Sequence, residues 1–475
     1  MNAPRLLVAG LSGGSGKTIV SLGVVGAWRR EGLTIAPFKK GPDYIDAAWL
    51  TRAAARPCRN LDLFMQPPDI IRASFATAAG EADMAVIEGN RGLYDGLDST
   101  GSCSSAELAK LLDVPVILVV DCTKVTRTVA AQVLGCQRLD PGVEIAGVVL
   151  NRVAGPRHRQ VIEESIADIC GLPVLGAVPR LREDPLPERH LGLVPPPEHG
   201  AEDDALGQVA GLAGDHLDLE AIRDLAGAAG AFDVPEADAG GAALPVAGAG
   251  ENIRIGVFHD AAFQFYYPEN LEALSREGAE LIDVSPIHDR DLPEVEALYI
   301  GGGFPETLAP ALAANESFKR SLGEKVAAGL PVYAECGGAV YLGRTLHYEG
   351  SAWPMAGIME IDFIFSPRPQ GHGYVELETA GENPFFPSGE ILRGHEFHYT
   401  GVKGDSYTGL PFAFRVMRGH GFDGERDGLC CRNVLATYTH LHALGSPAWA
   451  PGLVRAALRY RSAAGTANAS NTGRE

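Results

Sequence analysis

The sequence has no excess of basic residues and no long apolar run. Its 475 residues include 40 Lys and Arg against 60 Asp and Glu, which gives a formal net charge of −20. Surfaces that bind nucleic acid are basic because they neutralise phosphates, so this composition argues against a nucleic acid partner. A membrane-spanning helix needs about 20 consecutive apolar residues. The sequence has no such run, so we expect no membrane partner.

The eight cysteines also lack the paired spacing of zinc sites, and only Cys430 and Cys431 are adjacent. The N-terminus leads into a strand-like segment without the charged and then apolar segment of a secretory signal. We therefore expect reduced thiols and a cytoplasmic location. The chain is long, however: its 475 residues are too many for a single hydrophobic core. At least two domains are expected.

The sequence predicts two α/β domains. Residues 1–225 alternate short apolar runs with helix-like stretches, as in "RLLVAG" followed by "TIVSLGVVGAWRREG". This alternation is typical of a parallel sheet covered by helices on both faces. A second series, with the predicted strands "IRIGVF", "ALYIGGG" and "LPVYAEC", fills residues 252–461. Residues 226–251, rich in Ala, Gly and Pro, are expected to form a linker, and residues 462–475 a flexible tail.

A glycine-rich loop between the first predicted strand and the next helix is the first candidate site. Such loops bind phosphates through main-chain N–H groups at a helix N-terminus. Lys17 is expected to neutralise the β- and γ-phosphates of ATP, and Thr18 to ligate Mg²⁺. The usual G-x-x-x-x-G-K-[ST] pattern has Gly where this chain has Leu11, and a turn without a ligand is the alternative. Asn151, after "IAGVVL", is expected to read the adenine edge or to form a turn. The loop residues predicted to bind ATP are Gly13, Gly14, Ser15, Gly16, Lys17 and Thr18.

Carboxylates follow neighbouring predicted strands of the same domain. Asp43 and Asp46 follow the second strand, Glu88 ends "MAVIEG", and Asp95 lies in the next loop. The carboxyl ends of parallel strands share the edge where ligands bind. We expect Asp43 and Glu88 to hold Mg²⁺ together with Thr18, and Asp46 and Asp95 to assist substrate activation. Each acid taken singly can instead be a solvated loop residue or a helix cap.

A strand, a cysteine and two glycines form the second candidate site, in "LPVYAECGGAVYL". This order resembles the strand–turn–helix elbow that presents a nucleophile, and the helix start favours a thiolate. The run "THLH" offers His440 and His442 as bases, which should face opposite ways on a strand. Gly302 and Gly303 are suited to stabilising an oxyanion through main-chain N–H groups. A buried structural role for Cys336 is the alternative.

Three further histidines have no single predicted role. They are His372, His395 and His398, and metal binding, a substrate pocket and structural packing are all open to them. Their glycine and aromatic neighbours argue against the helix that would bring His395 and His398 onto one face as metal ligands.

Ordered motifs from Arg5 to Pro447 resemble those of the cobyrinic acid a,c-diamide synthases. The motifs are "GPDYID", "RNLDLFM", "PERHLGL", "AFQFYYPENLEAL", "YIGGGFPE", "YAECGG", "RGHEFHYT" and "ATYTHLH". Members of that family are glutamine- and ATP-dependent enzymes that amidate side-chain carboxylates of tetrapyrroles. The resemblance implies an N-terminal ATP-binding domain of the dethiobiotin-synthetase type. It also implies a C-terminal class I glutamine amidotransferase domain with a flavodoxin-like fold.

The resemblance further implies roles for individual residues. Cys336 matches the glutaminase nucleophile and His440 the catalytic histidine, which leaves His442 a structural role. This branch of the family is described as lacking the usual third acid, so the resemblance identifies none. The remaining matches are Gly302 and Gly303 in the oxyanion region, Lys17 and Thr18 in the phosphate loop, Asp43 and Glu88 near Mg-ATP, and Asp95 near the reacting carboxylate.

The implied reaction explains why one chain carries both sites. A carboxylate resists ammonia because its oxygen is a poor leaving group, and phosphoryl transfer from ATP converts it to an acyl phosphate that ammonia can displace. Cys336 would release that ammonia from glutamine through a glutamyl thioester, and the ammonia is expected to move between the domains along a shielded path. The expected product is the a,c-diamide of a corrinoid in cobalamin biosynthesis. A homodimer is a possible assembly.

Departures from the family pattern leave other readings open. Ala47, Ala48 and Trp49 stand where many corrinoid enzymes carry Pro and His, and "LSGGSGK" replaces a loop of the "SSGVGK" type. Sirohaem or a sirohydrochlorin-type ring is therefore an alternative substrate. An ATPase switch without amidase activity is an alternative of another class, and a standalone glutaminase is a third.

Overall fold

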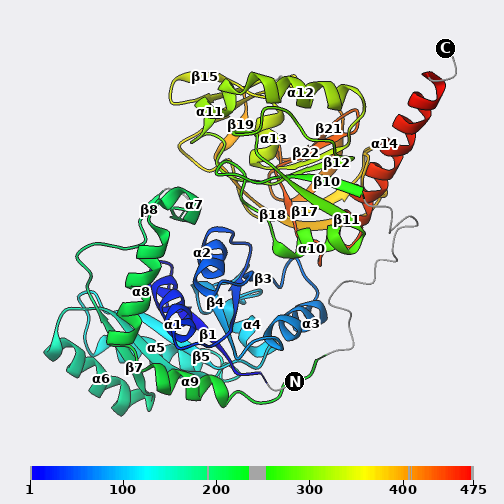
Figure 1. Cartoon of the computed structure of the whole chain (residues 1–475). Coiled ribbons are helices and arrows are strands. Elements are labelled where there is room, and N and C mark those ends of the chain that lie inside the picture. The colour runs from blue at the N-terminus through cyan, green and yellow to red at the C-terminus, as the bar shows by residue number, and fades with distance from the viewer. Residues whose placement is uncertain (1–2, 190–191, 235–252, 405–406, 408, 472–475) are drawn as a thin grey trace. The chain divides into compact units, whose positions relative to one another are not determined.

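The computed structural model describes residues 3–189, 192–234, 253–404, 407 and 409–471. The chain divides into two compact units, Met1–Ala239 and Gly240–Glu475, which are coloured from blue to green and from green to red in Figure 1. Of the expected linker at 226–251, residues 226 and 227 belong to helix α9, and residues 235–251 lie outside the described part. No helix of the described residues is long and apolar enough to cross a membrane.

The N-terminal unit is built on a seven-stranded sheet in the order β3-β2-β4-β1-β5-β6-β7. All neighbours in this sheet are parallel. The central strand, β1, is followed by the glycine-rich loop. The order confirms the predicted parallel α/β sheet and brings the ends of β1, β2 and β4 to one edge. The strands are β1 (Arg5–Gly10), β2 (Ile35–Lys40), β3 (Arg59–Leu61), β4 (Met84–Gly92), β5 (Val116–Asp121), β6 (Ile145–Val153) and β7 (Val174–Pro179), with a separate pair, β8 (Glu188–Arg189) and β9 (Gly192–Leu193).

Helices cover both faces of this sheet, because its strands are apolar on both sides. One core cluster packs Phe38, Ile87 and Leu118 against helices that follow β3 to β6. On the other face α1 lies beside α8 (Figure 1), where Gly23 lets Ala213 approach closely. The helices are α1 (Lys17–Arg30), α2 (Ile45–Ala54), α3 (Pro68–Ala79), α4 (Ser105–Leu111), α5 (Thr128–Leu139), α6 (Pro156–Cys170), α7 (Pro196–His199), α8 (Glu202–His216) and α9 (Leu219–Gly227).

The C-terminal unit is built on a ten-stranded mixed sheet in the order β11-β10-β12-β13-β22-β21-β20-β17-β18-β23. Its first five strands are parallel and have the flavodoxin-like order, which confirms that prediction. Antiparallel strands extend the sheet to β23. Its strands are β10 (Ile253–Phe258), β11 (Ala279–Val284), β12 (Ala297–Ile300), β13 (Val332–Glu335), β17 (Gly371–Thr379), β18 (Ile391–His398), β20 (Phe412–Arg418), β21 (Arg426–Cys431), β22 (Val434–Thr437) and β23 (His440–Leu441). A smaller sheet contains β14 (Thr345–Tyr348), β15 (Ser351–Pro354), β16 (Asp362–Phe365) and β19 (Thr400–Val402).

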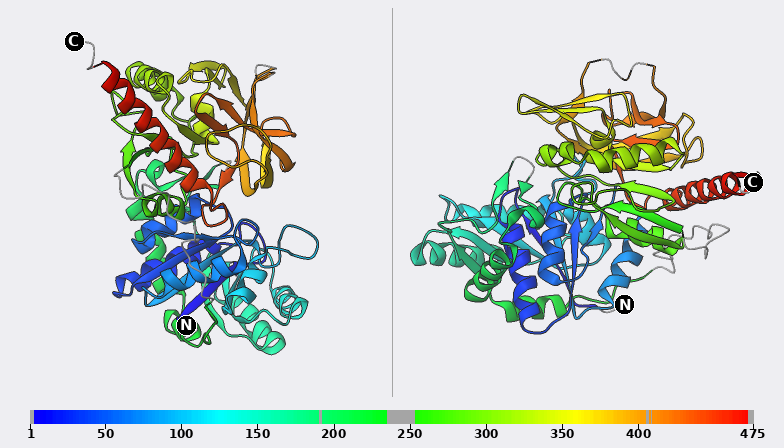
Figure 2. Two further views of the ribbon diagram at one scale, coloured as in Figure 1. Left: turned by 90° about the vertical axis from the view of Figure 1, so that its right-hand side faces the viewer. Right: turned by 45° about the horizontal axis from the view of Figure 1, so that its top comes forward.

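The last helix of this unit, α14, is longer than the sequence predicts. It runs from Trp449 to Asn471, so the segment from residue 462 that we expected to be a flexible tail begins inside a helix. The alanines of that segment favour a helix over the irregular chain that its small polar residues suggest. Figure 2 shows α14, in red, starting against its own sheet and extending beyond it. The other helices are α10 (Pro268–Arg276), α11 (Ala309–Ala314), α12 (Glu316–Ala327) and α13 (Gly337–Leu342).

Candidate active sites

The glycine-rich loop has the conformation of a phosphate-binding loop. Gly14 and Gly16 have φ values of 71° and 95°, in the left-handed region that favours glycine. The Ser15 hydroxyl donates to the main-chain oxygen of Ser12 at 2.9 Å, and the Lys17 ammonium donates to the same oxygen at 3.1 Å. Burial, and secondly the charge of Lys39, lowers the pKa of Lys17. A phosphate beside Lys17 would relieve both penalties.

Asn151 braces this loop. Its side-chain amide donates to the main-chain oxygen of Ser15 at 2.9 Å, and its side-chain oxygen accepts from the main-chain N–H of Arg152 at 2.9 Å. A Cβ atom on Gly16 would lie 2.0 Å from the amide nitrogen, so the residue at 16 must be glycine for Asn151 to reach the loop. Asn151 thus acts on the loop in this structure, and contact with adenine stays a prediction.

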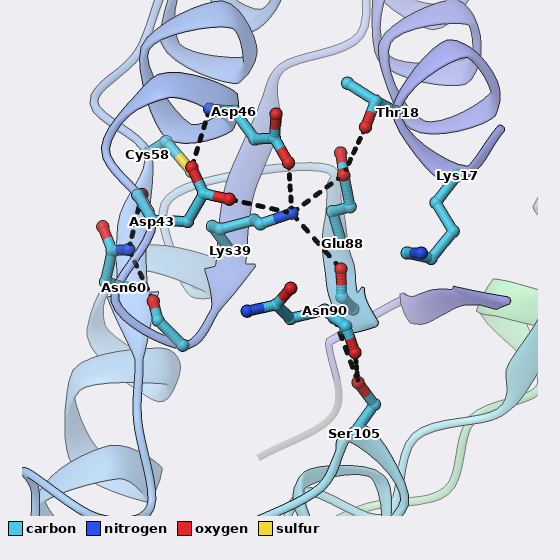
Figure 3. A network of polar contacts seen from close by, with 12 residues as sticks. Lys17, Thr18, Lys39, Asp43, Asp46, Cys58, Asn60, Glu88, Asn90 and Ser105 are labelled. Carbon is cyan, nitrogen blue, oxygen red and sulfur yellow. Dashed lines mark hydrogen bonds and ion pairs between the residues drawn. The ribbon is translucent and has the colours of Figure 1, made fainter. Parts of the chain in front are cut away.

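Lys39 lies at the centre of the acidic residues that the sequence identified (Figure 3). The register of β2 and β4 places Lys39 opposite Glu88. The Lys39 ammonium lies 2.6 Å from Asp46, 2.9 Å from Glu88 and 3.7 Å from Asp43. Thr18 donates to Glu88 at 2.8 Å. The structure therefore brings Thr18, Asp43, Asp46 and Glu88 together around a buried lysine that sequence reasoning did not single out.

The charges of this cluster depend on one another. Burial opposes ionisation of Lys39, but the carboxylates outweigh it and hold the pKa of Lys39 well above its usual value. Burial also opposes ionisation of Asp46, but Lys39 outweighs it and lowers the pKa of Asp46. Burial raises the pKa of Glu88, and burial followed by the charge of Asp46 raises the pKa of Asp43 to about 7. The cluster thus has a buried cation and more carboxylate than that cation neutralises.

The residues fit a divalent cation at Glu88. Its Oε1 atom accepts from Thr18 and Lys39, while its Oε2 atom is buried without a hydrogen-bond partner among the described residues. A buried carboxylate oxygen of this kind favours a hard cation with oxygen ligands. No group of three or more described His, Cys, Asp and Glu residues forms a ready-made metal site. Thr18 and Glu88 would therefore share Mg²⁺ with the phosphates of the nucleotide, and a direct bond from Asp43 stays a prediction.

Asp95 lies in the loop after β4 and closes a tight turn there. Its Oδ2 atom accepts from the main-chain N–H of Gly92 at 2.9 Å, and Gly92 in turn pairs with Gly10 at the end of β1. The negative charge of Asp95 also acts on Lys17. The structure thus places Asp95 beside the phosphate loop, and its role toward a substrate remains a prediction.

In the C-terminal unit, Cys336 occupies a strained turn between β13 and α13. Its φ of 48° is unfavourable for a residue with a side chain, and such strain is concentrated at functional sites. The main-chain N–H of Cys336 donates to the main-chain oxygen of Thr437 at 2.7 Å, which fixes the turn. Burial, and secondly the charge of Glu306, raises the pKa of the thiol, while the N–H of Gly337 opposes that rise. The thiol therefore needs a base before it can attack.

The glycine loop and His440 lie against each other. A Cβ atom on Gly302 would lie 2.6 Å from Cε1 and 3.2 Å from Nε2 of His440. A Cβ atom on Gly337, the residue after the thiol, would lie 3.0 Å from the main-chain nitrogen of Gly303. The imidazole, Gly302, Gly303 and the thiol turn thus lie close together, and their catalytic roles stay predictions. His440 Nδ1 faces Glu335 at 3.3 Å.

The other histidines have separate surroundings. His395 pairs with His440 across β18 and β23 and stacks on its ring, with centroids 4.9 Å apart. Burial, then the charge of His440, holds the pKa of His395 well below its usual value. His442 is fully buried, with Nε2 3.6 Å from Glu269. His398 stacks on Tyr438 with centroids 3.7 Å apart, and its Nε2 atom lies 3.4 Å from the carboxylate of Glu396, which accepts from it.

The comparisons agree with this division into two sites. Residues 6–194 match the CobQ/CobB/MinD/ParA nucleotide binding domain, and residues 254–448 match the CobB/CobQ-like glutamine amidotransferase domain. The chain is 42% identical over 453 residues to the cobyrinate a,c-diamide synthase of Magnetococcus marinus, covering 95% of this chain and 97% of that one. The chain belongs to the cobyrinate a,c-diamide synthase family. Other members include those of Syntrophotalea carbinolica, 39% identical over 96% of this chain and 98% of that one, and of Salmonella typhimurium, 38% identical over 93% and 95%.

One departure from the family pattern is explained by packing. Trp49 is fully buried in α2, its indole N–H donates to the main-chain oxygen of Val194 at 3.0 Å, and its ring meets His199 edge-on at 5.2 Å. The tryptophan thus stabilises the fold of this family member within the N-terminal unit. Its presence is no argument for a different ring as substrate.

Two residues of these sites were not found by sequence reasoning. Lys39 follows a strand-like run, and the acidic "GPDYID" after it was the only signal that a buried cation belongs there. Glu335 directly precedes Cys336, so an alternating strand pattern could have placed the two side chains on opposite sides. The alternating pattern of this strand could not show that His440, which is distant in the sequence, lies on the same side of the sheet as the side chain of Glu335.

Proposed function

We propose that this protein uses ATP and glutamine to convert the a and c acetate side chains of a corrinoid to amides, as a step of cobalamin biosynthesis. One observation carries the proposal. A chain aligned over 95% of its length with a cobyrinate a,c-diamide synthase holds a phosphate loop whose Thr18 donates to Glu88, and a glycine loop that lies against both His440 and the thiol turn. Mg²⁺ as the partner of ATP, a cytoplasmic location and a homodimer are predictions.

The N-terminal unit activates the carboxylate. Lys17 and the loop N–H groups hold the β- and γ-phosphates, and the carboxylate oxygen attacks the γ-phosphorus to give an acyl phosphate and ADP. Bound Mg²⁺ would neutralise phosphate charge beside Thr18 and Glu88. Lys39 opposes the effect of burial on Glu88 and Asp46, and it places positive charge near the transferred group. Asp95 helps to shape the loop next to Lys17.

The C-terminal unit supplies ammonia. His440 takes the proton of the Cys336 thiol, and the sulfur attacks the amide carbon of glutamine. The oxyanion that forms lies near the main-chain N–H groups of Gly302 and Gly303. The tetrahedral intermediate expels ammonia, which leaves with the proton from His440, and a glutamyl thioester remains. Water hydrolyses this thioester and regenerates the thiol.

The test is an amidation assay read by mass spectrometry. The full chain is incubated with ATP, Mg²⁺ and either glutamine or ammonium, together with cobyrinate, hydrogenobyrinate, sirohaem or sirohydrochlorin. Each amidation replaces OH by NH₂, so the mass change counts the amides directly. We expect two amides on a corrinoid. Amidation of only the sirohaem-type rings would assign the alternative substrate class.

The same assay separates an amidase from an ATPase switch. A switch would hydrolyse ATP without amidating any ring, and it would not respond to loss of the thiol. We expect Cys336→Ala to abolish amidation with glutamine while amidation with ammonium continues. ATP hydrolysis that ignores every ring and glutamine would overturn the proposed function.

A further inference from the structure

A buried carboxylate contacts the nitrogen of His440 that faces away from the glycine loop. Glu335, the last residue of β13, has no exposed surface. Its Oε2 atom lies 3.3 Å from Nδ1 of His440, and its Oε1 atom accepts the main-chain N–H of Leu441 at 3.2 Å. The carboxylate of Glu335 therefore contacts both the imidazole of His440 and the main chain of the next residue.

The path of the sheet explains how this contact forms. Glu335 pairs with Thr437 at the end of β22, and the chain then turns so that His440 pairs with His395 of β18. Cys336 lies in the turn that follows β13. The side chain of Glu335 points to the face of the sheet on which His440 lies. A residue directly before the nucleophile thus contacts the base, although 105 positions separate the two residues in the chain.

The orientation of the imidazole fits this contact. The Nδ1 atom faces Glu335, and the Cε1 and Nε2 atoms lie against Gly302 in the glycine loop. A carboxylate at Nδ1 favours the tautomer with the proton on Nδ1, which leaves Nε2 free of a proton and able to accept one. The ring of His395 stacks on His440 and restricts its tilt.

Further side chains hold the carboxylate in place. The Tyr299 hydroxyl donates to Glu335 Oε2 at 3.3 Å and lies 3.2 Å from the side-chain amide of Asn270, which donates to it. Asn270 also binds the main-chain oxygen of Leu441 at 2.9 Å and the N–H of Ala443 at 2.7 Å. This layer fixes Glu335 and residues 441–443 in one arrangement, as the supporting partners of an active-site histidine do.

We propose that Glu335 is the positioning acid of the glutaminase site. It takes the role of the third acid that the family resemblance leaves unassigned, by orienting His440 and stabilising the imidazolium that forms when the thiol loses its proton. The inference rests on the proposed function, because it concerns the base that activates Cys336. It requires no further group, because His440 passes the proton of the thiol to the departing ammonia and Glu335 only orients the imidazole.

The test compares Glu335→Gln with the parent protein, using the full chain. Glutamine keeps the size of the side chain but loses the charge that holds the tautomer. We expect kcat for glutamine-dependent amidation to fall by about 10²- to 10⁴-fold, as when the acid of a catalytic triad becomes an amide. KM for glutamine should stay within about threefold, since the residue acts on the base rather than on substrate binding. Amidation with ammonium should be unchanged.

Two further variants keep the result decisive. Glu335→Asp retains the charge on a shorter side chain, and we expect it to recover part of the lost kcat. Glu269→Gln is the matched control, because Glu269 is equally buried but lies beside His442. It should change thermal stability and leave kcat for glutamine near that of the parent. If Glu335→Gln does not fold, a loss of kcat without a change in KM in Glu335→Asp supports the proposal.

The inference is overturned if both Glu335 variants keep kcat within about threefold of the parent. It is also overturned if KM rises in step with the loss of kcat, or if Glu269→Gln loses as much kcat as Glu335→Gln. Failure of the proposed function looks different, because Cys336→Ala would then retain glutamine-dependent turnover or ammonium would not support amidation in the parent. Inactivation of Cys336 by a glutamine analogue with an electrophilic carbon gives an independent rate, which should fall in parallel with kcat.

Discussion

The two candidate sites differ in how they use buried charge. Around the phosphate loop, Lys39 meets Asp46 and Glu88 within 2.9 Å, and the cluster retains carboxylate charge. Around the thiol, burial raises the pKa of Cys336 and lowers that of His395, so neutral forms dominate. Glu335 is a buried carboxylate that contacts His440, the proposed base.

This difference matches the chemistry of each site. Phosphoryl transfer involves charge that is present throughout the reaction, so fixed charges of both signs and a metal ion can act on it. Thiol attack creates charge only when a proton moves, so a neutral thiol and a neutral base suffice until substrate arrives. The phosphate site is thus stabilised by attraction between charges, whereas at the thiol site packing holds the strained turn of Cys336 in place.

The largest effect on amidation should come from removing the charge of Lys17 at the phosphate site. Loss of the Cys336 thiol is the matching change at the other site. Lys17→Met should lower amidation by roughly 10³-fold with either nitrogen source, because the lysine stabilises transferred charge. Hydrolysis of glutamine by the same variant should persist. Cys336→Ala should do the reverse, losing glutamine hydrolysis and keeping amidation with ammonium. Equal losses in all assays for both variants would contradict the division between the sites.

Lys39→Met should destabilise the N-terminal unit by about 3–5 kcal/mol, because it leaves buried carboxylates without their partner. Calorimetry of the full chain should show a lower transition temperature for that unit. The pair of Lys325 and Glu294 gives the control, because the side chain of Glu294 is 78% exposed and Lys325→Met should cost less than about 1 kcal/mol. Similar losses for the two variants would mean that attraction does not hold the phosphate site together.

Gly302→Ala should impair the thiol site by displacing its base. The new methyl group would meet His440 at 2.6 Å, and a displacement of about 1 Å can lower a rate by about 10²-fold. Glutamine-dependent kcat should fall by that factor and ammonium-dependent kcat should not change. Gly323→Ala in α12 is the control, because its methyl group meets nothing within 4 Å. An unaffected Gly302→Ala enzyme would show that close packing of the imidazole is dispensable.

The smallest effect should be a change of stability with pH. Burial, then Asp46, raises the pKa of Asp43 to about 7, so the folded protein holds this proton more tightly than the unfolded chain. The stabilisation from Asp43 is therefore complete in acid and declines as the pH rises to about 7. Asp43→Asn cannot ionise, and its unfolding free energy relative to the parent should rise by about 2 kcal/mol between about pH 5 and pH 8.

Denaturant unfolding at the two pH values, without nucleotide, measures this difference. Asparagine keeps the acceptor that receives the N–H of Asp46 at 2.9 Å, so the hydrogen bond survives. Asp203→Asn is the control, because the Asp203 side chain is 88% exposed and pairs only with an exposed arginine among its described ion pairs. If the difference in unfolding free energy between Asp43→Asn and the parent does not vary with pH, Asp43 is ionised across this range.

The sequence alone determined the features that depend on local pattern. Alternating apolar runs and helices predicted the parallel sheets, which the strand orders confirm. The glycines and the intact GKT predicted the phosphate loop, and the strand, cysteine and glycines predicted the thiol turn. These signals are readable because each depends on residues adjacent in the chain, where the conformation is set by sterics and main-chain hydrogen bonds. Composition did not predict the end of the last helix. The small polar residues after 462 suggested a flexible tail, but α14 continues to Asn471.

Only the tertiary structure decided which distant side chains meet. The register of β2 against β4 placed Lys39 beside Glu88, and the return of the chain from β22 to β23 placed His440 on Glu335. The close contact of Asn151 with Gly16 likewise shows that Asn151 braces the loop, while its contact with adenine stays a prediction. Register and strand order result from the packing of whole sheets, so no local pattern specifies them. The charges that the two sites carry follow from those contacts.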